Sequence, residues 1–265
     1  MSRYFFLSSF LEPISLEDFK KFDMSAFRET MSLNLSSCDK KSFRCLARSF
    51  DLINFSIFWS GGKMERALGE VTQDNVEQLL VKRQWDDGTD MEPFLQDYLN
   101  TYKTNEERIE NYSFLIRDFL HFYRLNATNA FLREYFSFKQ DLRVIMAGFR
   151  AKLLNEDISR VLRNENTDEF TVLQILMQKN SSKFIPPLGY RDLGDIFEDY
   201  GQLPDSLHRE MVLYEFNKIE ELFRDSYFNS DAVLGRSAAY MTAYCYHFSS
   251  RKNSKRILND IEIMI

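Results

Sequence analysis

The sequence predicts an all-α protein built from antiparallel helical hairpins. Of its 265 residues, 25 are Phe and 13 are Tyr, whereas only 9 are Gly and 5 are Pro. Many bulky aromatic residues and few turn formers favour long, closely packed helices over a turn-rich β fold. Apolar residues also recur at alternating spacings of three and four, which places them on one face of a helix. We therefore expect helices that pack in pairs through their apolar faces.

The apolar pattern fills four windows, each of which predicts a helix. These windows span residues 43–57, 109–123, 131–149 and 234–248. The segment that precedes them, residues 4–10, is ambiguous between a buried strand and a helix. In an all-α architecture we expect it to form a helix or an extended strap that packs on the C-terminal unit.

Polar residues mark the expected helix starts, where they place oxygen acceptors over free backbone N–H groups. The expected caps are Ser15 with Asp18, Asn105 ahead of Glu106 and Glu107, and Thr167 before Asp168 and Glu169. We expect breaks at residues 60–62, 86–89, 125–128, 180–189 and 201–204, which are rich in residues that interrupt helices. Gly61 and Gly62 should end the first long helix, because Gly tolerates the left-handed conformation found there.

These breaks predict three helical units that form one integrated domain. The N-terminal unit spans residues 1–88, the central unit 89–180 and the C-terminal unit 181–265. Two prolines, Pro186 and Pro187, lie in the longest interruption and mark the clearest division.

One helical motif occurs three times, which indicates a helical unit used repeatedly. The first copy contains Asp51 and Asn54 and ends at Lys63; the second contains Asp141 and Arg143 and ends at Lys152. A weaker third copy has Asn253, Lys255 and Arg256, with Ser250 in place of the acid.

The recurring acids have two interpretations. Asp51 follows Arg48 by three residues, and Asp141 precedes Arg143 by two. Each acid could form a buried ion pair that locks neighbouring hairpins together. The alternative is an exposed ion pair worth only a few tenths of a kcal/mol.

The motifs resemble those of a known family, the C subunit of V-type ATPases, which is also called the d subunit. Residues 135–152 are similar to the acid-then-Asn helix of that family, and residues 227–240 with Asn253 resemble its last long helix. The opening residues 4–10 resemble the start of the small bacterial proteins related to this family. The resemblance covers nearly the whole chain. It departs at Val144, where the family usually has Asn, and at Ser250, where it usually has Glu.

The resemblance implies a non-catalytic coupling subunit. Members of that family sit on a membrane rotor ring and hold the foot of the central shaft in a funnel of three similar helical units. They pass torque between the ATP-hydrolysing head and the ring, which moves protons or sodium ions. We therefore expect the central shaft subunits and the rotor ring as partners. The expected location is cytoplasmic, peripheral to the inner membrane through these partners, and we expect no catalytic residue, metal or cofactor.

Two groups of residues are the candidates for this role. The interface candidates are cations that recur after the copies of the motif: Lys63, Arg66, Arg150, Lys152, Arg251, Lys255 and Arg256. The structural candidates belong to the motif itself: Asp51, Asn54, Asp141, Arg143 and Asn253.

Two other functions are weighed against this one. A cytosolic helical interaction protein descended from the same family should expose a large apolar groove where the funnel would be. An enzyme with an unfamiliar all-α site would need buried titratable residues that converge in a pocket. Gly61, Gly62 and Lys63 resemble a phosphate loop, but the upstream Gly and the following Ser or Thr are missing.

Composition also argues against some classes of partner. A net charge of −6 and a pI near 5.3 argue against nonspecific nucleic-acid binding, which needs a clustered positive surface. No window reaches the ~18 apolar residues needed to span a bilayer, and we expect no signal peptide.

Three cysteines without C-x-x-C spacing predict neither disulfides nor a zinc site and suit a reducing compartment. His121, His208 and His247 are isolated, and we expect His121 and His247 to be hydrogen-bonded packing residues.

Overall fold

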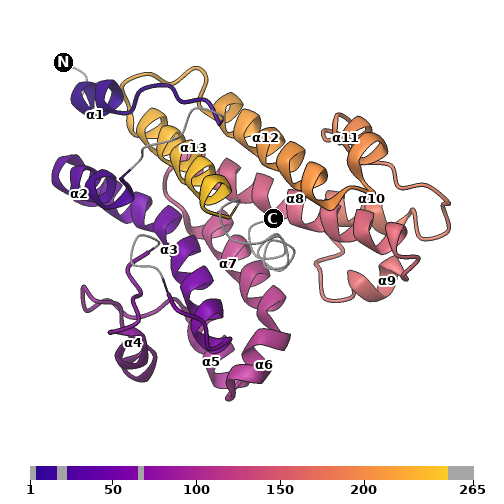
Figure 1. Ribbon diagram of the computed structural model, residues 1–265, viewed down its shortest axis with the longest axis horizontal. Coiled ribbons are helices and arrows are strands. Elements are labelled where there is room, and N and C mark those ends of the chain that lie inside the picture. The colour runs from indigo at the N-terminus through magenta and orange to yellow at the C-terminus, as the bar shows by residue number, and fades with distance from the viewer. Residues whose placement is uncertain (1–3, 17–22, 65–68, 250–265) are drawn as a thin grey trace. The chain divides into compact units, whose positions relative to one another are not determined.

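The computed structural model describes residues 4–16, 23–64 and 69–249, and within these stretches every regular element is a helix (Figure 1). The extended backbone described there pairs in one isolated antiparallel bridge, between Gln84 and Asp90. The predicted all-α fold is confirmed. The funnel arrangement that the resemblance implies stays a prediction. In the described part of the chain, no helix combines the length and apolar character that a membrane span requires.

Thirteen helices follow one another in the described residues. They are α1 (Phe5–Phe10), α2 (Met24–Asn34), α3 (Ser37–Trp59), α4 (Val76–Lys82), α5 (Pro93–Thr101), α6 (Asn105–Glu110), α7 (Tyr112–Asn126), α8 (Ala130–Leu153), α9 (Ile158–Val161), α10 (Phe170–Leu176), α11 (Leu193–Tyr200), α12 (Pro204–Leu222) and α13 (Ser230–Ser249).

The chain groups into two compact units. The first comprises the described residues among 1–136 and 219–247, and the second comprises those among 137–218, together with residues 248 and 249. The chain therefore enters the second unit within α8 and leaves it within α12. The predicted division into three units near residues 88 and 180 stays a prediction.

The first unit is organised around α3, which contacts α6 and α7, while α7 also packs on α5. Its core is aromatic, as the composition predicts. The rings of Phe55 and Trp59 stack with centroids 5.6 Å apart, and Phe119 meets Phe136 edge to face at 5.6 Å. Side chains of this size each contribute about 1.5–3 kcal/mol when fully buried, so the first unit has a substantial core of its own.

The opening segment forms the helix α1, which settles the ambiguity seen in the sequence. The segment that contains this helix packs on α13. Arg236 of α13 donates hydrogen bonds to the backbone carbonyls of Ser8 and Leu11, the latter at 2.7 Å. The Tyr240 hydroxyl donates to the carbonyl of Glu12 at 2.9 Å. These side chains satisfy carbonyl groups at the end of α1 that have no partner within the helix.

The end of α3 confirms the prediction for the paired glycines. Gly61 has φ +69°, a left-handed conformation that costs little without a Cβ atom. Its N–H donates to the carbonyl of Phe58 at 3.0 Å, and the N–H of Gly62 donates to the carbonyl of Ile57 at 2.8 Å. The glycines therefore close the helix and are not part of a phosphate loop.

The start of α6 corrects one predicted cap. Thr104, not Asn105, is the N-cap, and its hydroxyl accepts from the N–H of Glu107 at 3.2 Å. The Glu107 carboxylate in turn accepts from the N–H of Thr104 at 3.1 Å, which completes a capping box. The predicted cap was one residue too late, because Glu107, at the third helical position, forms the capping box with Thr104. The helix predicted across residues 109–123 is also interrupted, at Asn111, between α6 and α7.

The start of α10 corrects a second cap. The helix begins at Phe170 with Glu169 as its N-cap, so the prediction for Thr167 is wrong. The Asn166 side chain instead accepts from the N–H of Asp168 at 3.0 Å, which forms a turn before the helix begins. The expected cap at Ser15 depends on Asp18, which lies outside the described residues.

The second unit has a smaller apolar core around the C-terminal half of α8. The rings of Phe149 and Phe197 stack with centroids 4.1 Å apart, and Phe184 meets Phe197 edge to face at 5.9 Å. Leu142 and Ile175 are fully buried in the same core. The predicted stripe of α8 is thus confirmed as a packing face.

Candidate functional site

The first copy of the motif lies in the middle of α3, where Asp51 and Asn54 are both 0% exposed. Asp51 Oδ1 accepts from the backbone N–H groups of Glu70 at 2.6 Å and Val71 at 2.8 Å. Asn54 Nδ2 donates to the carbonyl of Val71 at 2.9 Å. Because a buried backbone group needs a partner, these two side chains hold residues 69–71 against α3. We call Arg48, Asp51, Asn54, Glu70 and Val71 the Asp51 cluster.

Arg48 completes the Asp51 cluster and connects it to two further segments. Its guanidinium lies 3.1 Å from Asp51 Oδ2 and 2.9 Å from Glu70 Oε2, with Glu92 Oε1 at 3.7 Å. It also stacks over the Trp85 ring at 3.5 Å. The ion pair of Arg48 and Asp51 is therefore buried, as the first of the two interpretations expects. A buried pair of this kind is costly to break, because either partner alone would be an uncompensated charge.

Burial raises the pKa of Asp51 from its ordinary value of 3.8 to about 6. The Arg48 guanidinium and the hydrogen bond from Val71 oppose this effect, while the Glu70 carboxylate adds to it. The carboxyl group is still ionised at neutral pH, which suits a group that accepts hydrogen bonds from three donors.

We expect the Asp51 carboxyl group to make the protein less stable as pH rises from about 4 to about 6. In that window the folded protein still holds a proton on Asp51 that the unfolded chain has lost, so the unfolding free energy falls with rising pH. Urea unfolding across this range should show the stability of the wild type fall relative to Asp51→Asn, by up to about 3 kcal/mol, with no further change above about pH 6.5. A relative stability that grows with pH would mean that Arg48 and the backbone donors outweigh burial.

Cys45 lies on α3 near this cluster. Burial raises the pKa of its thiol to about 12, and the nearby Glu92 carboxylate acts in the same direction. The reactive form of cysteine is the thiolate, so this thiol is a poor nucleophile at neutral pH.

The second copy of the motif, on α8, makes different contacts within the second unit. Asp141 is half-buried and accepts from the Tyr190 hydroxyl at 2.8 Å. Arg143 forms an ion pair with Glu165 at 2.5 Å. Val144 is 1% exposed in the apolar core, so the position that usually holds Asn in the resembled family is a packing position in this chain.

The cationic interface candidates divide into three groups. Lys63 is exposed just beyond the end of α3, and Arg150 is half-buried on α8. Lys152 donates to the backbone carbonyls of Lys179 at 2.8 Å and Ser181 at 2.7 Å, so it stabilises a loop of its own unit. The remaining candidates lie outside the described residues: Arg66, Arg251, Lys255 and Arg256, together with the motif residue Asn253.

The histidines behave as packing residues where the structure shows their contacts. His121 Nδ1 lies 3.3 Å from Arg124 Nη2, and His247 Nε2 lies 2.6 Å from the carbonyl of Leu16. His208 is buried, and burial lowers its pKa. Within the described ranges, no three side chains of His, Cys, Asp or Glu come together as metal ligands would.

Sequence reasoning missed the partners that come from loops. One member of the Asp51 cluster, Glu70, and three residues close to the cluster, Gly69, Trp85 and Glu92, belong to no periodic window. Their roles depend on the path of the chain between α3 and α5. The one local signal is that residue 69 is a glycine, because glycine readily adopts the positive φ that the structure shows there.

The sequence was compared with protein families, with known proteins and with solved structures. A family described as "Protein of unknown function (DUF2764)" matches residues 1–263. A protein of Chlamydia muridarum (strain MoPn / Nigg) is 44% identical over 262 residues, which cover 99% of this chain and 98% of that protein. One of Chlamydia trachomatis serovar D is 41% identical with the same coverage. Both carry the description "Uncharacterized protein". No solved structure matches the chain significantly.

Proposed function

The chain belongs to the family described as "Protein of unknown function (DUF2764)", and we propose that it acts as a non-catalytic coupling subunit in the central stalk of a V-type ATPase or ATP synthase. In this role it links the rotor shaft to the membrane ring, at the cytoplasmic side of the inner membrane. Its partners are the central shaft subunits and the ring.

The observation that carries the proposal is the repeated motif, together with the contacts that its acid makes in each copy. The motif lies on two helices of nearly equal length, α3 with 23 residues and α8 with 24. In each helix the acid holds a segment that returns later in the chain, residues 69–71 for Asp51 and Tyr190 for Asp141. A repeated helical unit of this kind is what the resemblance to the V-type ATPase family implies.

Rigidity also supports a coupling role. A protein that passes torque must deform little, because a compliant one would store the applied torque as strain. Buried ion pairs and stacked aromatic side chains in the first unit resist such deformation, since breaking either leaves an unpaired charge or a cavity.

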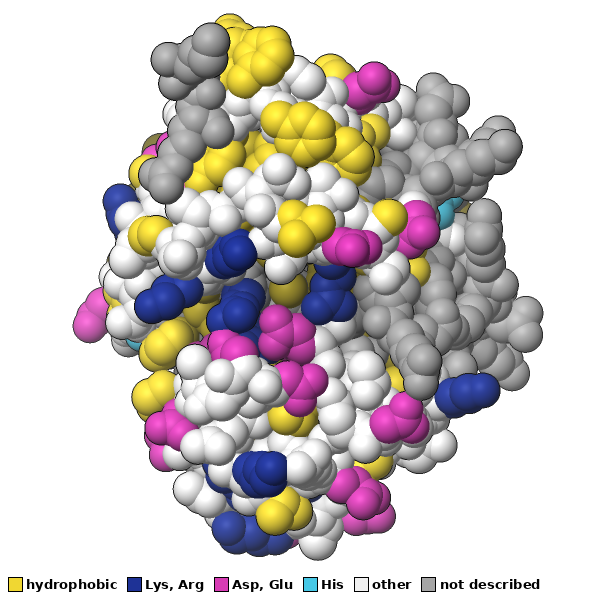
Figure 2. Space-filling view, turned by 90° about the vertical axis from the view of Figure 1, so that its left-hand side faces the viewer, with side chains coloured by type: hydrophobic (Ala, Val, Ile, Leu, Met, Phe, Trp, Pro, Cys, Tyr) yellow, Lys and Arg dark blue, Asp and Glu magenta, His cyan; other side chains and the backbone are white. Residues whose placement is uncertain are grey.

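One observation favours the alternative, a cytosolic helical interaction protein descended from the same family. Aromatic side chains of α1 and of the loop before α13 are exposed: Phe5, Phe6, Phe10, Tyr227 and Phe228. Figure 2 shows apolar side chains gathered at the top of one face of the molecule. Exposed apolar patches are typical of surfaces that bind proteins, whichever partner is bound.

Assembly with an ATPase tests the proposal. We expect the purified chain to bind V-type central shaft subunits directly in a pull-down and to co-purify with the membrane ring. Changing Lys63, Arg251, Lys255 and Arg256 to Glu should slow association and reduce its dependence on salt, because charges at the rim of an interface mainly steer encounter. Lys152 is left unchanged because it stabilises a loop.

A variant with the same charge change elsewhere is the control. It carries Glu at four exposed positions outside the candidate set: Lys41, Lys82, Lys103 and Lys183. Equal binding by both variants across a salt titration would contradict the site assignment. Failure of the unmodified chain to bind shaft or ring would favour the detached interaction protein.

A further inference from the structure

A cavity lined by both polar and apolar side chains lies between α2 and α3 of the first unit. Its volume is about 280 Å³, just below the range of about 300–1,000 Å³ typical of small-molecule sites. Leu35, Phe43 and Ala47 contribute buried apolar side chains to its lining. The cavity therefore combines an apolar base with a polar opening, in a size that suits a small ligand.

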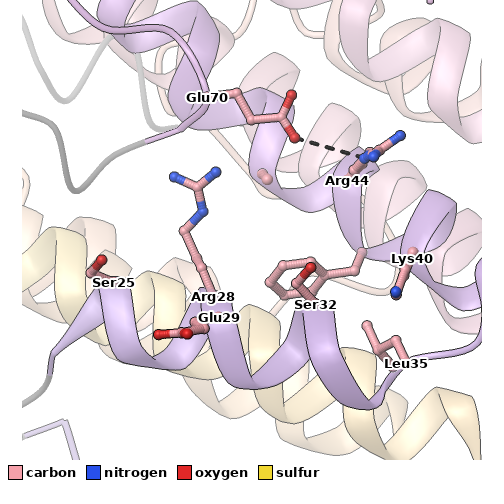
Figure 3. A pocket seen from close by; sticks show the side chains of 10 residues that line it. Ser25, Arg28, Glu29, Ser32, Leu35, Lys40, Arg44 and Glu70 are labelled. Carbon is pink, nitrogen blue, oxygen red and sulfur yellow. Dashed lines mark ion pairs between the residues drawn. The ribbon is translucent and has the colours of Figure 1, made fainter. Parts of the chain in front are cut away.

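Three cations from the two helices border this cavity: Arg28 from α2, and Lys40 and Arg44 from α3. Figure 3 shows Arg28 reaching from α2 toward Glu70, with the hydroxyl groups of Ser25 and Ser32 on the same helix. Figure 2 shows Lys and Arg side chains next to Asp and Glu side chains near the middle of the face that it views.

The three cations differ in whether a carboxylate balances their charge. Arg44 forms ion pairs with Glu70 at 3.7 Å and with Asp87. Arg28 donates to the backbone carbonyl of Gly69, which carries no formal charge. Within the described residues, Lys40 has neither an ion pair nor a hydrogen bond for its ammonium group.

The charge of the lining is opposite to that of the chain. Three cations and two carboxylates, Glu29 and Glu70, line the cavity, a formal excess of one positive charge (three against two), while Arg44 is also paired with Asp87 outside the lining. Glu29 extends from α2 beside Arg28 in Figure 3 and is itself part of the lining. Arg28 and Lys40 are the lining cations that form no ion pair within the described residues, on a protein whose net charge is −6. A partly enclosed positive site attracts anions, since enclosure lowers the dielectric screening.

We propose that this cavity binds a small anion that carries phosphate or carboxylate groups. Lys40 and Arg28 supply charge-assisted hydrogen bonds, and the hydroxyls of Ser25 and Ser32 supply neutral ones. The site is independent of the coupling role, because it requires no other protein.

Calorimetric titration with pyrophosphate and with citrate tests the proposal and separates the two kinds of anion. We expect at least one to bind with a Kd of about 0.1–1 mM, and to bind more weakly as ionic strength rises. Lys40→Gln should weaken binding about ten-fold, the effect of losing one charge-assisted contact. Lys41→Gln is the matched control, since Lys41 is the exposed neighbour of Lys40 on α3 and does not line the cavity.

Amide chemical shifts of the wild type provide a measurement that requires no variant. The bound anion should shift the signals of α2 and the first half of α3. The proposal is overturned if neither anion binds, if the shifts fall elsewhere, or if Lys40→Gln binds as tightly as Lys41→Gln.

Discussion

Replacing Asp51 by Ala is expected to lower the free energy of unfolding by about 3–5 kcal/mol. The change leaves the N–H groups of Glu70 and Val71 without their acceptor, and it removes one carboxylate from the buried Arg48. Unsatisfied buried donors cost about 1–3 kcal/mol each, so the loss comes from what remains rather than from the ion pair alone. Urea unfolding followed by circular dichroism measures the effect.

Two control variants show whether the loss of stability comes from the burial of the Asp51 carboxylate. Asp97→Ala, at an exposed position of α5, should change stability by less than about 0.5 kcal/mol. Asp141→Ala removes the corresponding acid of the second copy and should cost less than Asp51→Ala, because Asp141 is only half-buried. A loss for Asp51→Ala no larger than that for Asp97→Ala would show that the Asp51 cluster does not hold residues 69–71.

The sequence was sufficient for the long helices and the position of the first motif. The apolar stripe from Phe43 to Ile57 lies within α3, and Gly61 closes that helix as expected. Periodicity and terminal glycines act locally, within one or two turns, so they can be interpreted without knowing the fold. The pairing of Asp51 with Arg48 also followed, because the two residues lie three apart on the same face.

The remaining contacts of the candidate site depend on tertiary structure. Glu70 and Glu92 reach Arg48 from segments without periodicity, so nothing in their local sequence pairs them with α3. Lys152 is a second residue whose contacts the sequence could not predict. Its position after the motif predicts an interface, which stays a prediction, and the structure adds that its ammonium group donates to carbonyls of its own unit. An exposed cation and a loop-capping cation look alike in sequence, because the difference lies in distant backbone groups.

Gly69→Ala is expected to cost at least about 3 kcal/mol of unfolding free energy. Gly69 has φ +105°, and a Cβ atom there would lie 2.3 Å from Asp51 Oδ1 and 3.0 Å from the backbone nitrogen of Asp51. The new methyl group must therefore displace the carboxylate that holds Glu70 and Val71. Thermal or urea unfolding of the variant measures the loss.

Gly88→Ala separates backbone strain from this contact. Gly88 also has a positive φ, +79°, but a Cβ atom there would meet nothing within 4 Å. Its replacement should cost only about 1 kcal/mol, the strain of the left-handed conformation. Because the larger cost at Gly69 comes from Asp51, Gly69→Ala should be less harmful in an Asp51→Ala background than in the wild type, a coupling that a double-mutant cycle measures directly. Additive losses, or equal losses at Gly69 and Gly88, would mean that the chain can move residues 69–71 away from α3 without breaking the buried contacts, and that the Asp51 cluster is not the element that makes this unit rigid.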